Sequence, residues 1–143
     1  AKTVLVLGDN AGEAVFDRVM IEQFPGSARV YYAVKGGPVI NDVIREDALE
    51  SGLDAVAEII ANGADAQGTL LDQCTPEFNE LFARADVVIA KGQGNFETLN
   101  NAPRDIWFLL QIKCAVIAHH YNYHVGDWLI TTLSSFRARE VAS

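Results

Sequence analysis

The feature that most constrains the fold is a continuous apolar run, TVLVL, at residues Thr3–Leu7. Such a run is typical of a strand buried on both faces, as in a parallel sheet covered by helices. Further strand-like runs occur at Arg29–Val34, Ala57–Ala61, Asp86–Ala90 and Ile106–Ile112, and Trp128–Thr132 has the character of an edge strand. The chain is therefore expected to form one sheet of five to six strands.

Helix-like segments separate these runs, at Gly12–Phe24, Asn41–Ser51 and Pro76–Ala85. In the first, we expect an apolar face made by Ala14, Val15, Val19, Ile21 and Phe24. Gly52 is expected to end the second helix, and Thr75 to cap the start of the third. Alternating strands and helices predict a single α/β domain over residues 1–143, a three-layer α/β/α sandwich with a mostly parallel sheet.

Composition narrows the functional classes. The formal net charge of −8 disfavours a nucleic-acid partner, and it requires a local positive site for any anionic substrate. We expect no membrane partner, because no apolar run is long enough to span a bilayer and no signal peptide is evident. Cys74 and Cys114 lack a CxxC spacing, which predicts free thiols and a cytoplasmic location. The chain lacks an initiating Met and enters its first strand at once, so we expect a processed, trimmed or excised domain.

Polar clusters follow the predicted strands. They are Asp9-Asn10 after the first strand, Asn41-Asp42 shortly after the second, Gly63–Thr69 after the third, Lys91–Asn95 after the fourth and Lys113 after the fifth. In open parallel sheets, ligands bind where the loops at the carboxyl ends of the strands converge. We therefore expect all five clusters to face one edge of the sheet.

The first cluster and Asp42 suit a metal site. Carboxylate and amide oxygens from Asp9, Asn10 and Asp42 are ligands that hard divalent cations prefer. A structural alternative has Asp9 and Asp42 capping the helices that follow them, with Asn10 in a left-handed turn. The sequence leaves both interpretations open.

The lysines and glycines of the other clusters suit an anion. Lys91 and Lys113 each follow a buried strand and could hold a phosphate oxygen, although solvated loop lysines are the ordinary alternative. The glycine-rich segments Gly63–Thr69 and Gly92–Asn95 could offer backbone N–H groups, but neither a P-loop nor a GxGxxG fingerprint is present. We expect structural or surface roles for His119, His120 and His124, since no zinc pattern includes them, and a buried, inert Cys114.

Five segments taken in order, GDNAGEAVFD, GGPVINDVIREDA, NGADAQGT, ADVVIAKGQGNFETL and IWFLLQIKCAVIA, resemble the damage-control phosphatase family, also known as domain of unknown function 89. These five motifs are most similar to those of the small stand-alone prokaryotic branch of the family. The resemblance covers the family's C-terminal α/β part, from about Thr3 to Trp128. Five motifs in the same order are far more specific than any one of them.

The resemblance implies a metal-dependent phosphomonoesterase on an α/β/α sandwich, working with Mn²⁺, Co²⁺, Ni²⁺ or Mg²⁺. Its substrates would be small phosphorylated metabolites such as sugar phosphates or damaged cofactor intermediates. The motifs assign residues as follows: Asp9, Asn10 and Asp42 to the metal and to catalysis, Lys113 to catalysis through the substrate phosphate, Lys91, Gly92, Gly94 and Asn95 to a substrate loop, Glu13 to the substrate site, and Asp47 to support of the metal ligands.

The implied mechanism has the metal polarise the phosphorus while Lys91 and Lys113, with N–H groups near Gly92–Asn95, stabilise the developing charge. The attacking group is either a water activated by the metal or Asp9 itself, through an aspartyl-phosphate. Family members usually carry a helical segment ahead of the GDNAG strand, which covers part of the active-site mouth. We therefore expect a helical cap segment from elsewhere, or a homo-oligomer, as partner.

Two rival functions stay open on the sequence. One is a non-catalytic metal- or phosphometabolite-binding α/β module or fragment, in which the site survives without turnover. The other is a nucleotide-binding protein of the general doubly wound type. The missing phosphate fingerprint and the missing acid after the second strand argue against the nucleotide-binding protein.

Overall fold

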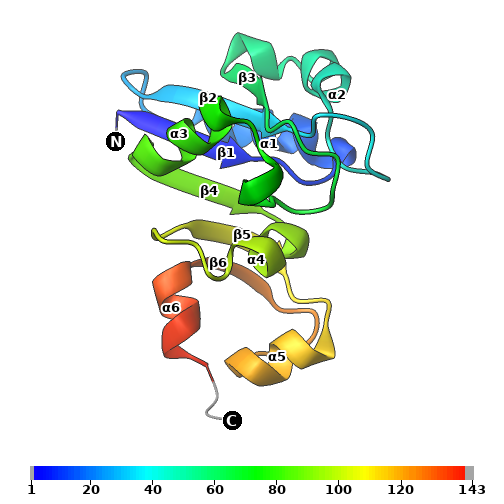
Figure 1. Cartoon of the computed structure of the whole chain (residues 1–143), viewed down its shortest axis with the longest axis vertical. Helices are drawn as coiled ribbons and strands as arrows, with labels where there is room; N and C mark the ends of the chain where they lie inside the picture. Colours follow the sequence, from blue (N-terminus) through cyan, green and yellow to red (C-terminus); the bar gives the residue numbers. More distant parts are fainter. Residues whose placement is uncertain (1, 141–143) are drawn as a thin grey trace.

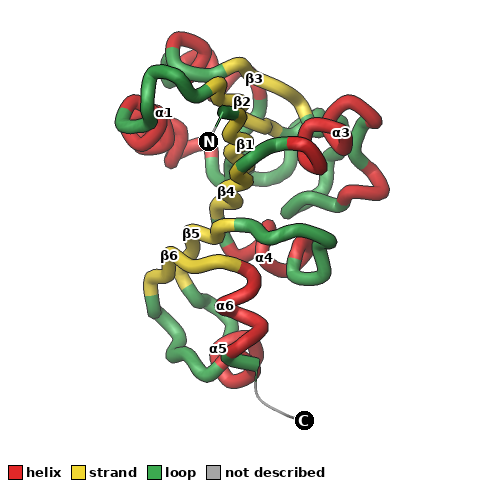
Figure 2. The backbone as a smooth tube through the Cα atoms, turned by 90° about the vertical axis from the view of Figure 1, so that its left-hand side faces the viewer, coloured by secondary structure: helices red, strands yellow, loops and turns green. Residues whose placement is uncertain are grey.

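The computed structural model describes residues 2–140. One sheet runs through the molecule, and helices lie against both of its faces (Figures 1 and 2). The strands are β1 (Thr3–Leu7), β2 (Arg29–Val34), β3 (Glu58–Ala61), β4 (Val87–Lys91), β5 (Trp107–Gln111) and β6 (Trp128–Thr132). The helices are α1 (Ala14–Glu22), α2 (Arg45–Glu50), α3 (Pro76–Arg84), α4 (Gln93–Leu99), α5 (Ala115–Tyr121) and α6 (Leu133–Ala138), with 3-10 turns at Ala11–Glu13, Leu53–Ala55 and Leu71–Gln73. The predicted α/β/α fold is confirmed.

The strand order explains where a site can form. The sheet runs β3-β2-β1-β4-β5-β6, and every neighbouring pair is parallel except β5 and β6. From β1 the chain moves outward to β2 and β3, and then returns to place β4 on the other side of β1. The loops after β1 and β4 therefore leave in different directions and open a crevice between them.

The core has two layers, one on each face of the sheet. On one face, Val4 and Val6 of β1 pack in a cluster with Ala14 of α1. On the other face, Leu5 and Leu7 belong to a cluster that α3, α4 and α6 complete. Because both faces are covered at β1, successive residues of this strand are buried, which is why its sequence is a continuous apolar run.

Within residues 2–140, helices cover strands β5 and β6 on one face only. Phe108 of β5 is buried among the helices of the second layer, whereas Trp107 is 46% exposed, and Trp128 and Ile130 of β6 are each 75% exposed. The strand registers place Trp107, Trp128 and Ile130 on the same face as α1. In the edge view of Figure 2, α1 lies beside the strands above β5, and over residues 2–140 no helix covers β5 and β6 on that face.

Three local expectations differ from the structure. The helix expected at Asn41–Ser51 begins only at Arg45, because Asp42 forms a bridge with Asn10. Lys91–Asn95 is not a loop, since β4 runs to Lys91 and α4 begins at Gln93. In α1, Val15 and Val19 are more than half exposed, and the buried positions are Ala14, Asp17 and Ile21.

Two expected helix signals are confirmed. The Thr75 hydroxyl accepts a hydrogen bond from the Phe78 N–H at 3.1 Å and so caps α3. Gly52 follows α2 with a φ of +74°, the left-handed conformation that commonly ends a helix.

Candidate active site

The turn after β1 lies against the segment that follows β2. Asn10 and Asp42 form a β-bridge, the Ala11 N–H donates to the Asn41 carbonyl at 2.8 Å, and the Val43 N–H donates to the Asp9 carbonyl at 2.8 Å. These backbone contacts bring together Asp9, Asn10 and Asp42, which are distant in the sequence. The structure thus gathers the three residues that the sequence assigns to a metal.

These three side chains have no hydrogen-bond partner within residues 2–140, and the capping alternative is wrong. Asn10 is extended, with φ −85° and ψ 142°, and its side chain caps nothing. The residue at the start of α1, Glu13, forms no capping hydrogen bond through its side chain in the described chain. At α2 it is Asp47, not Asp42, that accepts a hydrogen bond from the first backbone N–H, that of Ile44, at 3.0 Å. The oxygens of the three side chains are left available to a ligand.

Negative charge accumulates around Asp9. Burial, followed by the carboxylates of Glu13 and Asp42, raises the pKa of Asp9 from 3.8 to about 6, against the opposing effect of Lys113 and Lys91. Burial also raises the pKa of Asp42, although Lys35 opposes the shift. A bound cation would relieve both costs, because it stabilises the ionised carboxylates.

The donor set fits a hard divalent cation. Asp9 and Asp42 supply carboxylates and Asn10 an amide oxygen, which leaves further positions for water or substrate. Within residues 2–140, no three His, Cys, Asp or Glu side chains gather into a metal cluster. An all-protein cage of the kind that structural zinc requires is therefore not seen in the described part of the chain.

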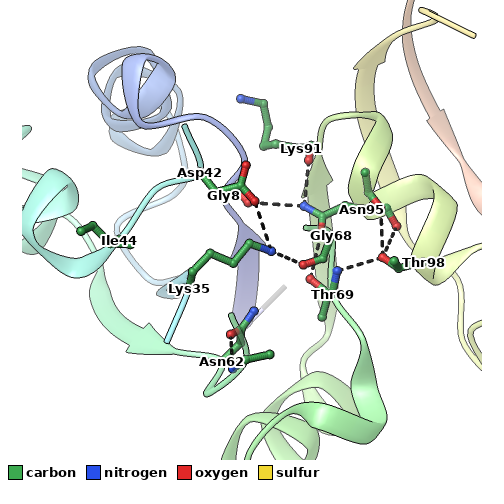
Figure 3. Close-up of polar contacts among 12 residues, drawn as sticks. Gly8, Lys35, Asp42, Ile44, Asn62, Gly68, Thr69, Lys91, Asn95 and Thr98 are labelled. Atoms are coloured by element: carbon green, nitrogen blue, oxygen red, sulfur yellow. Dashed lines mark hydrogen bonds and ion pairs between the residues drawn. The ribbon is translucent and has the colours of Figure 1, made fainter. Parts of the chain in front are cut away.

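Lys35 is a site residue that the sequence analysis missed. It follows β2 directly, its side chain is buried, and its ammonium lies 3.8 Å from Asp42 Oδ2 and donates to the Gly68 carbonyl (Figure 3). Burial lowers the pKa of Lys35, while Asp42 and Asp9 oppose that shift. The signal was available, since a lysine directly after a strand is the pattern that pointed to Lys91.

Gly92 lies directly against Asp9. Its φ of +85° is in the left-handed region, and a Cβ at this position would collide with the carboxylate of Asp9. Its own N–H is already used, donating to the Leu109 carbonyl at 2.9 Å. Gly92 is therefore required for the approach of β4 to Asp9, and its predicted substrate contact stays a prediction.

Asn95 is buried and joins three segments (Figure 3). Its Nδ2 donates to the Lys91 carbonyl at 2.8 Å and the Gly8 carbonyl at 3.4 Å, and its Oδ1 accepts from the Thr69 hydroxyl at 2.7 Å. The amide holds the ends of β1 and β4 to the loop that contains Thr69. Its assignment to the substrate stays a prediction, while its visible role is to support the loops of the site.

The remaining predicted residues surround two cavities that meet at Asp9. A cavity of about 360 Å³ is lined by Asp9, Glu13, Lys91 and Lys113 together with apolar side chains of β5 and β6, and a second, of about 270 Å³, is lined by Asp9, Asp42, Gly94 and Lys113 among others. Gln93, which the sequence analysis did not single out, accepts from the backbone N–H groups of Lys113 and Cys114 at 2.8 and 3.2 Å. This contact ties the start of α4 to Lys113.

The histidines and cysteines lie apart from this site. His120 contacts Glu140 at 2.6 Å, and the side chain of His124 is 94% exposed. Cys74 and Cys114 are free thiols, both half-buried. None of the helices within residues 2–140 combines the length and apolar character needed to cross a membrane.

The chain is similar to known proteins over most of its length. A model of the damage-control phosphatase ARMT1-like domain matches residues 1–129. Damage-control phosphatase PH1575 from Pyrococcus horikoshii is 45% identical over 130 residues, which cover 88% of this chain and 45% of that protein. A damage-control phosphatase from Archaeoglobus fulgidus is 35% identical over 127 residues, covering 87% of this chain and 44% of that protein.

The comparison with solved structures finds the same family. The crystal structure of a DUF89 family protein from Pyrococcus horikoshii, PH1575, superposes with a TM-score of 0.87 and 40% identity, covering 91% of this chain and 47% of that one. The chain thus spans less than half the length of the curated relatives it matches.

Proposed function

The chain belongs to the damage-control phosphatase ARMT1-like domain family, and from this premise we propose that it forms the active site of a metal-dependent phosphatase. The observation that carries the proposal is the state of Asp9, Asn10 and Asp42. A β-bridge joins Asn10 to Asp42, Asp9 and Asp42 line one cavity, and no residue within 2–140 hydrogen-bonds to the three side chains. Relatives named damage-control phosphatases support the same activity.

In this proposal Asp9, Asn10 and Asp42 hold one divalent cation, Mn²⁺, Co²⁺, Ni²⁺ or Mg²⁺. When bound, such a cation polarises the phosphoryl group and offsets its charge. Glu13 adds a further carboxylate beside the site, because it lines the same cavity as Asp9. Its Oε2 is buried without a hydrogen-bond partner in the described chain. Asp47 contributes indirectly, by capping α2 behind the segment that positions Asp42.

The chain's own cations would bind the substrate phosphate. Lys91 and Lys113 line the same cavity as Asp9, and their charges stabilise phosphate oxygens during transfer. The phosphorus–oxygen ester bond breaks as water, or the Asp9 carboxylate followed by water, attacks phosphorus, and the alcohol leaves. Gly92 lines this cavity, Gly94 lines the second cavity beside Asp9, and Asn95 holds the Lys91 backbone.

We propose small phosphate monoesters as substrates, including sugar phosphates and damaged cofactor intermediates. The family relation supports this class, and so does the charge distribution. The chain has a net charge of −8, so a compact anion gains most where lysines line a cavity beside a cation site. We also propose a cytoplasmic location, which the free thiols of Cys74 and Cys114 favour.

We propose, further, that a helical cap segment covers the face formed by Trp107, Trp128 and Ile130. Exposed aromatic and branched side chains gathered on one face commonly mark a contact surface, and this face borders the proposed site. The relatives contain as much chain again beyond the matched region. A homo-oligomer that buries the same face is the second candidate, and sedimentation of the chain at several concentrations separates the two.

The proposal is tested by hydrolysis of p-nitrophenyl phosphate with metal-stripped protein, adding back Mn²⁺, Co²⁺, Ni²⁺ or Mg²⁺. We expect metal-dependent release of p-nitrophenol that is lost in Asp9→Ala and in Asp42→Asn, a change that keeps the side-chain shape beside Lys35. Asp54→Ala is the matched control, since this carboxylate is exposed on a distant turn.

Each outcome has a distinct meaning. Equal turnover in Asp9→Ala and the unmodified chain would overturn the site assignment. A rise in melting temperature with Mn²⁺ but no turnover would favour the non-catalytic binding module, and adding the cap-bearing half of a relative then asks whether turnover returns.

A further inference from the structure

Asp17 is a buried carboxylate that the proposed function leaves unexplained. It lies on the core-facing side of α1 and is 2% exposed. Both of its oxygens have close partners: Oδ1 accepts from the Lys91 ammonium at 2.5 Å, and Oδ2 accepts from the Tyr32 hydroxyl at 2.6 Å. A charged residue at a core position of a helix is costly unless it is paired in this way.

The pair connects the core to the proposed active site. Tyr32 belongs to β2, and its hydroxyl packs beneath Gly8, the residue before Asp9. Burial raises the pKa of Tyr32, so its hydroxyl remains a hydrogen-bond donor to Asp17. At the other end, Lys91 lines the cavity that also contains Asp9 and Lys113.

These contacts restrict the position of the Lys91 ammonium but leave it N–H donors for a ligand. The Lys91 side chain is 14% exposed, and its ammonium lies 3.8 Å from Glu13 Oε2 in addition to its bond with Asp17. An ammonium has three N–H donors, of which Asp17 takes one. A free lysine stem loses much rotamer entropy when it is fixed on a ligand, and a preformed bond to Asp17 removes part of that cost before the ligand arrives.

A purely structural role explains these observations less well. A buried ion pair is on average no better for stability than apolar residues of similar volume. This pair is also asymmetric, since Asp17 is 2% exposed whereas Lys91 lines the cavity. The enclosed partner is therefore placed to fix the accessible one.

We propose that Asp17 is a positioning residue which, with Tyr32, holds the Lys91 ammonium at the cavity so that it meets the phosphoryl group of the substrate. This inference rests on the proposed function, in which Lys91 binds that group. It adds two residues to the site that contact neither the metal nor the substrate.

The test measures binding of inorganic phosphate to the chain in the presence of Mn²⁺ by calorimetry, with KM and kcat for p-nitrophenyl phosphate where turnover is measurable. Lys91→Met should weaken phosphate binding by about tenfold or more, as expected for loss of a charged hydrogen bond. Asp17→Asn should weaken it by about tenfold and raise KM more than it lowers kcat. Tyr32→Phe, which keeps the ring in the core, should have a smaller effect in the same direction.

A double-mutant cycle separates positioning from folding. Adding Asp17→Asn to Lys91→Met should cause no further loss of phosphate affinity, because the two residues act as one unit. Mn²⁺ affinity should stay unchanged in Asp17→Asn. Glu22→Gln is the matched control on the same helix, since Glu22 bonds Arg18 at 2.9 Å on the surface, and it should leave phosphate binding unaltered.

Three results would overturn the inference. If Lys91→Met weakens phosphate binding but Asp17→Asn and Tyr32→Phe do not, Asp17 is structural only and the proposed function stands. Additive losses in the cycle would also show that Asp17 does not act through Lys91. If Lys91→Met itself leaves phosphate binding unchanged, the assigned role of Lys91 fails together with this inference, while metal binding by Asp9 and Asp42 is judged by its own test.

Discussion

Two groups of polar side chains share the carboxyl edge of the sheet, and they differ in how their hydrogen bonds are satisfied. The side chains of Asp9, Asn10 and Asp42 form no hydrogen bond with any residue within 2–140, although the Lys35 ammonium lies 3.8 Å from Asp42 Oδ2. Asn95 of α4 and Thr69 of the loop after β3 instead use their side chains to bind one another and the neighbouring backbone. Figure 3 shows this second group as a connected network.

The difference separates the proposed metal ligands from the residues that support the loops. Asp9 and Asn10 are half-buried, and no hydrogen bond within residues 2–140 occupies their side-chain oxygens, so these oxygens are open to a partner from outside the chain. A set of side chains whose hydrogen bonds are all made within the chain indicates a structural role, because its bonds hold the loops in place. Chemistry is therefore expected to depend on the first group and folding on the second, and each prediction below tests one side of that division.

The largest expected effect is on turnover. Asp9→Ala should lower metal-dependent hydrolysis of p-nitrophenyl phosphate by about 10³-fold or more, since a bound metal supplies several kcal/mol of stabilisation to the transition state. Its melting temperature should equal or exceed that of the unmodified chain, because burial and neighbouring carboxylates disfavour the ionised Asp9. A large drop in melting temperature would place Asp9 among the supports instead.

Asn95→Ala should instead lower the stability of the fold. Removing the amide takes a hydrogen-bond partner from two backbone carbonyls and from the Thr69 hydroxyl, and we expect the free energy of unfolding to fall by about 2–3 kcal/mol. Urea denaturation measures this change, and Thr69→Val should cost about 1 kcal/mol by the same reasoning. The division between ligands and supports breaks down if Asn95→Ala is less destabilising than Asp9→Ala.

Gly92→Ala tests whether the close approach of Gly92 to Asp9 positions the Asp9 carboxylate. The added Cβ must displace the Asp9 carboxylate, so Mn²⁺ affinity measured by calorimetry should fall by about 10–100-fold, the usual effect of disturbing what orients a metal ligand. Gly26→Ala is the matched control, because nothing lies within 4 Å of a Cβ at that position. Unchanged Mn²⁺ binding in Gly92→Ala would mean that Asp9 does not need its observed position.

Metal-free protein should lose stability as the pH rises. The folded-state pKa of Asp9, about 6, lies above its ordinary value of 3.8, so the folded state binds more protons between these values. The contribution of Asp9 to stability is fully present below pH 3.8 and is lost as the pH passes through about 6. We therefore expect Asp9→Asn to gain stability relative to the unmodified chain over this window.

The measurement is the free energy of unfolding of both proteins from pH 4 to 8, and the difference between them isolates Asp9 from the other carboxylates. Mn²⁺ at pH 7 should stabilise the unmodified chain and not Asp9→Asn. A pH-independent difference would show that the carboxylate is not perturbed.

The smallest expected effect lies on the uncovered face. Trp128→Ser should change the free energy of unfolding of this chain by less than about 0.5 kcal/mol, because the side chain is 75% exposed. It should nevertheless weaken self-association or the binding of a cap segment, as measured by sedimentation. A strongly destabilised variant would show that this face is packed within the chain.

The sequence was most informative where burial is strongest. Thr3–Leu7 and Arg29–Val34 are strands with the predicted bounds, because their apolar patterns reflect burial that a local window can detect. Trp128–Thr132 also has the predicted bounds, although none of its residues is buried. The sequence failed where contacts are distant. The start of α2 is delayed by the bridge between Asn10 and Asp42, and the apolar residues Val15 and Val19 are exposed on α1.

The candidate site divides in the same way. The sequence by itself placed Asp9, Asn10, Asp42, Lys91 and Lys113 at the carboxyl ends of strands, because a strand's direction and its following loop are local properties. Only the tertiary structure decided that β4 returns beside β1, that Lys35 and Asp17 are enclosed, and that Asn95 is a support. Strand order and the partner of each polar atom depend on contacts between segments far apart in the chain, and no local pattern of residues encodes them.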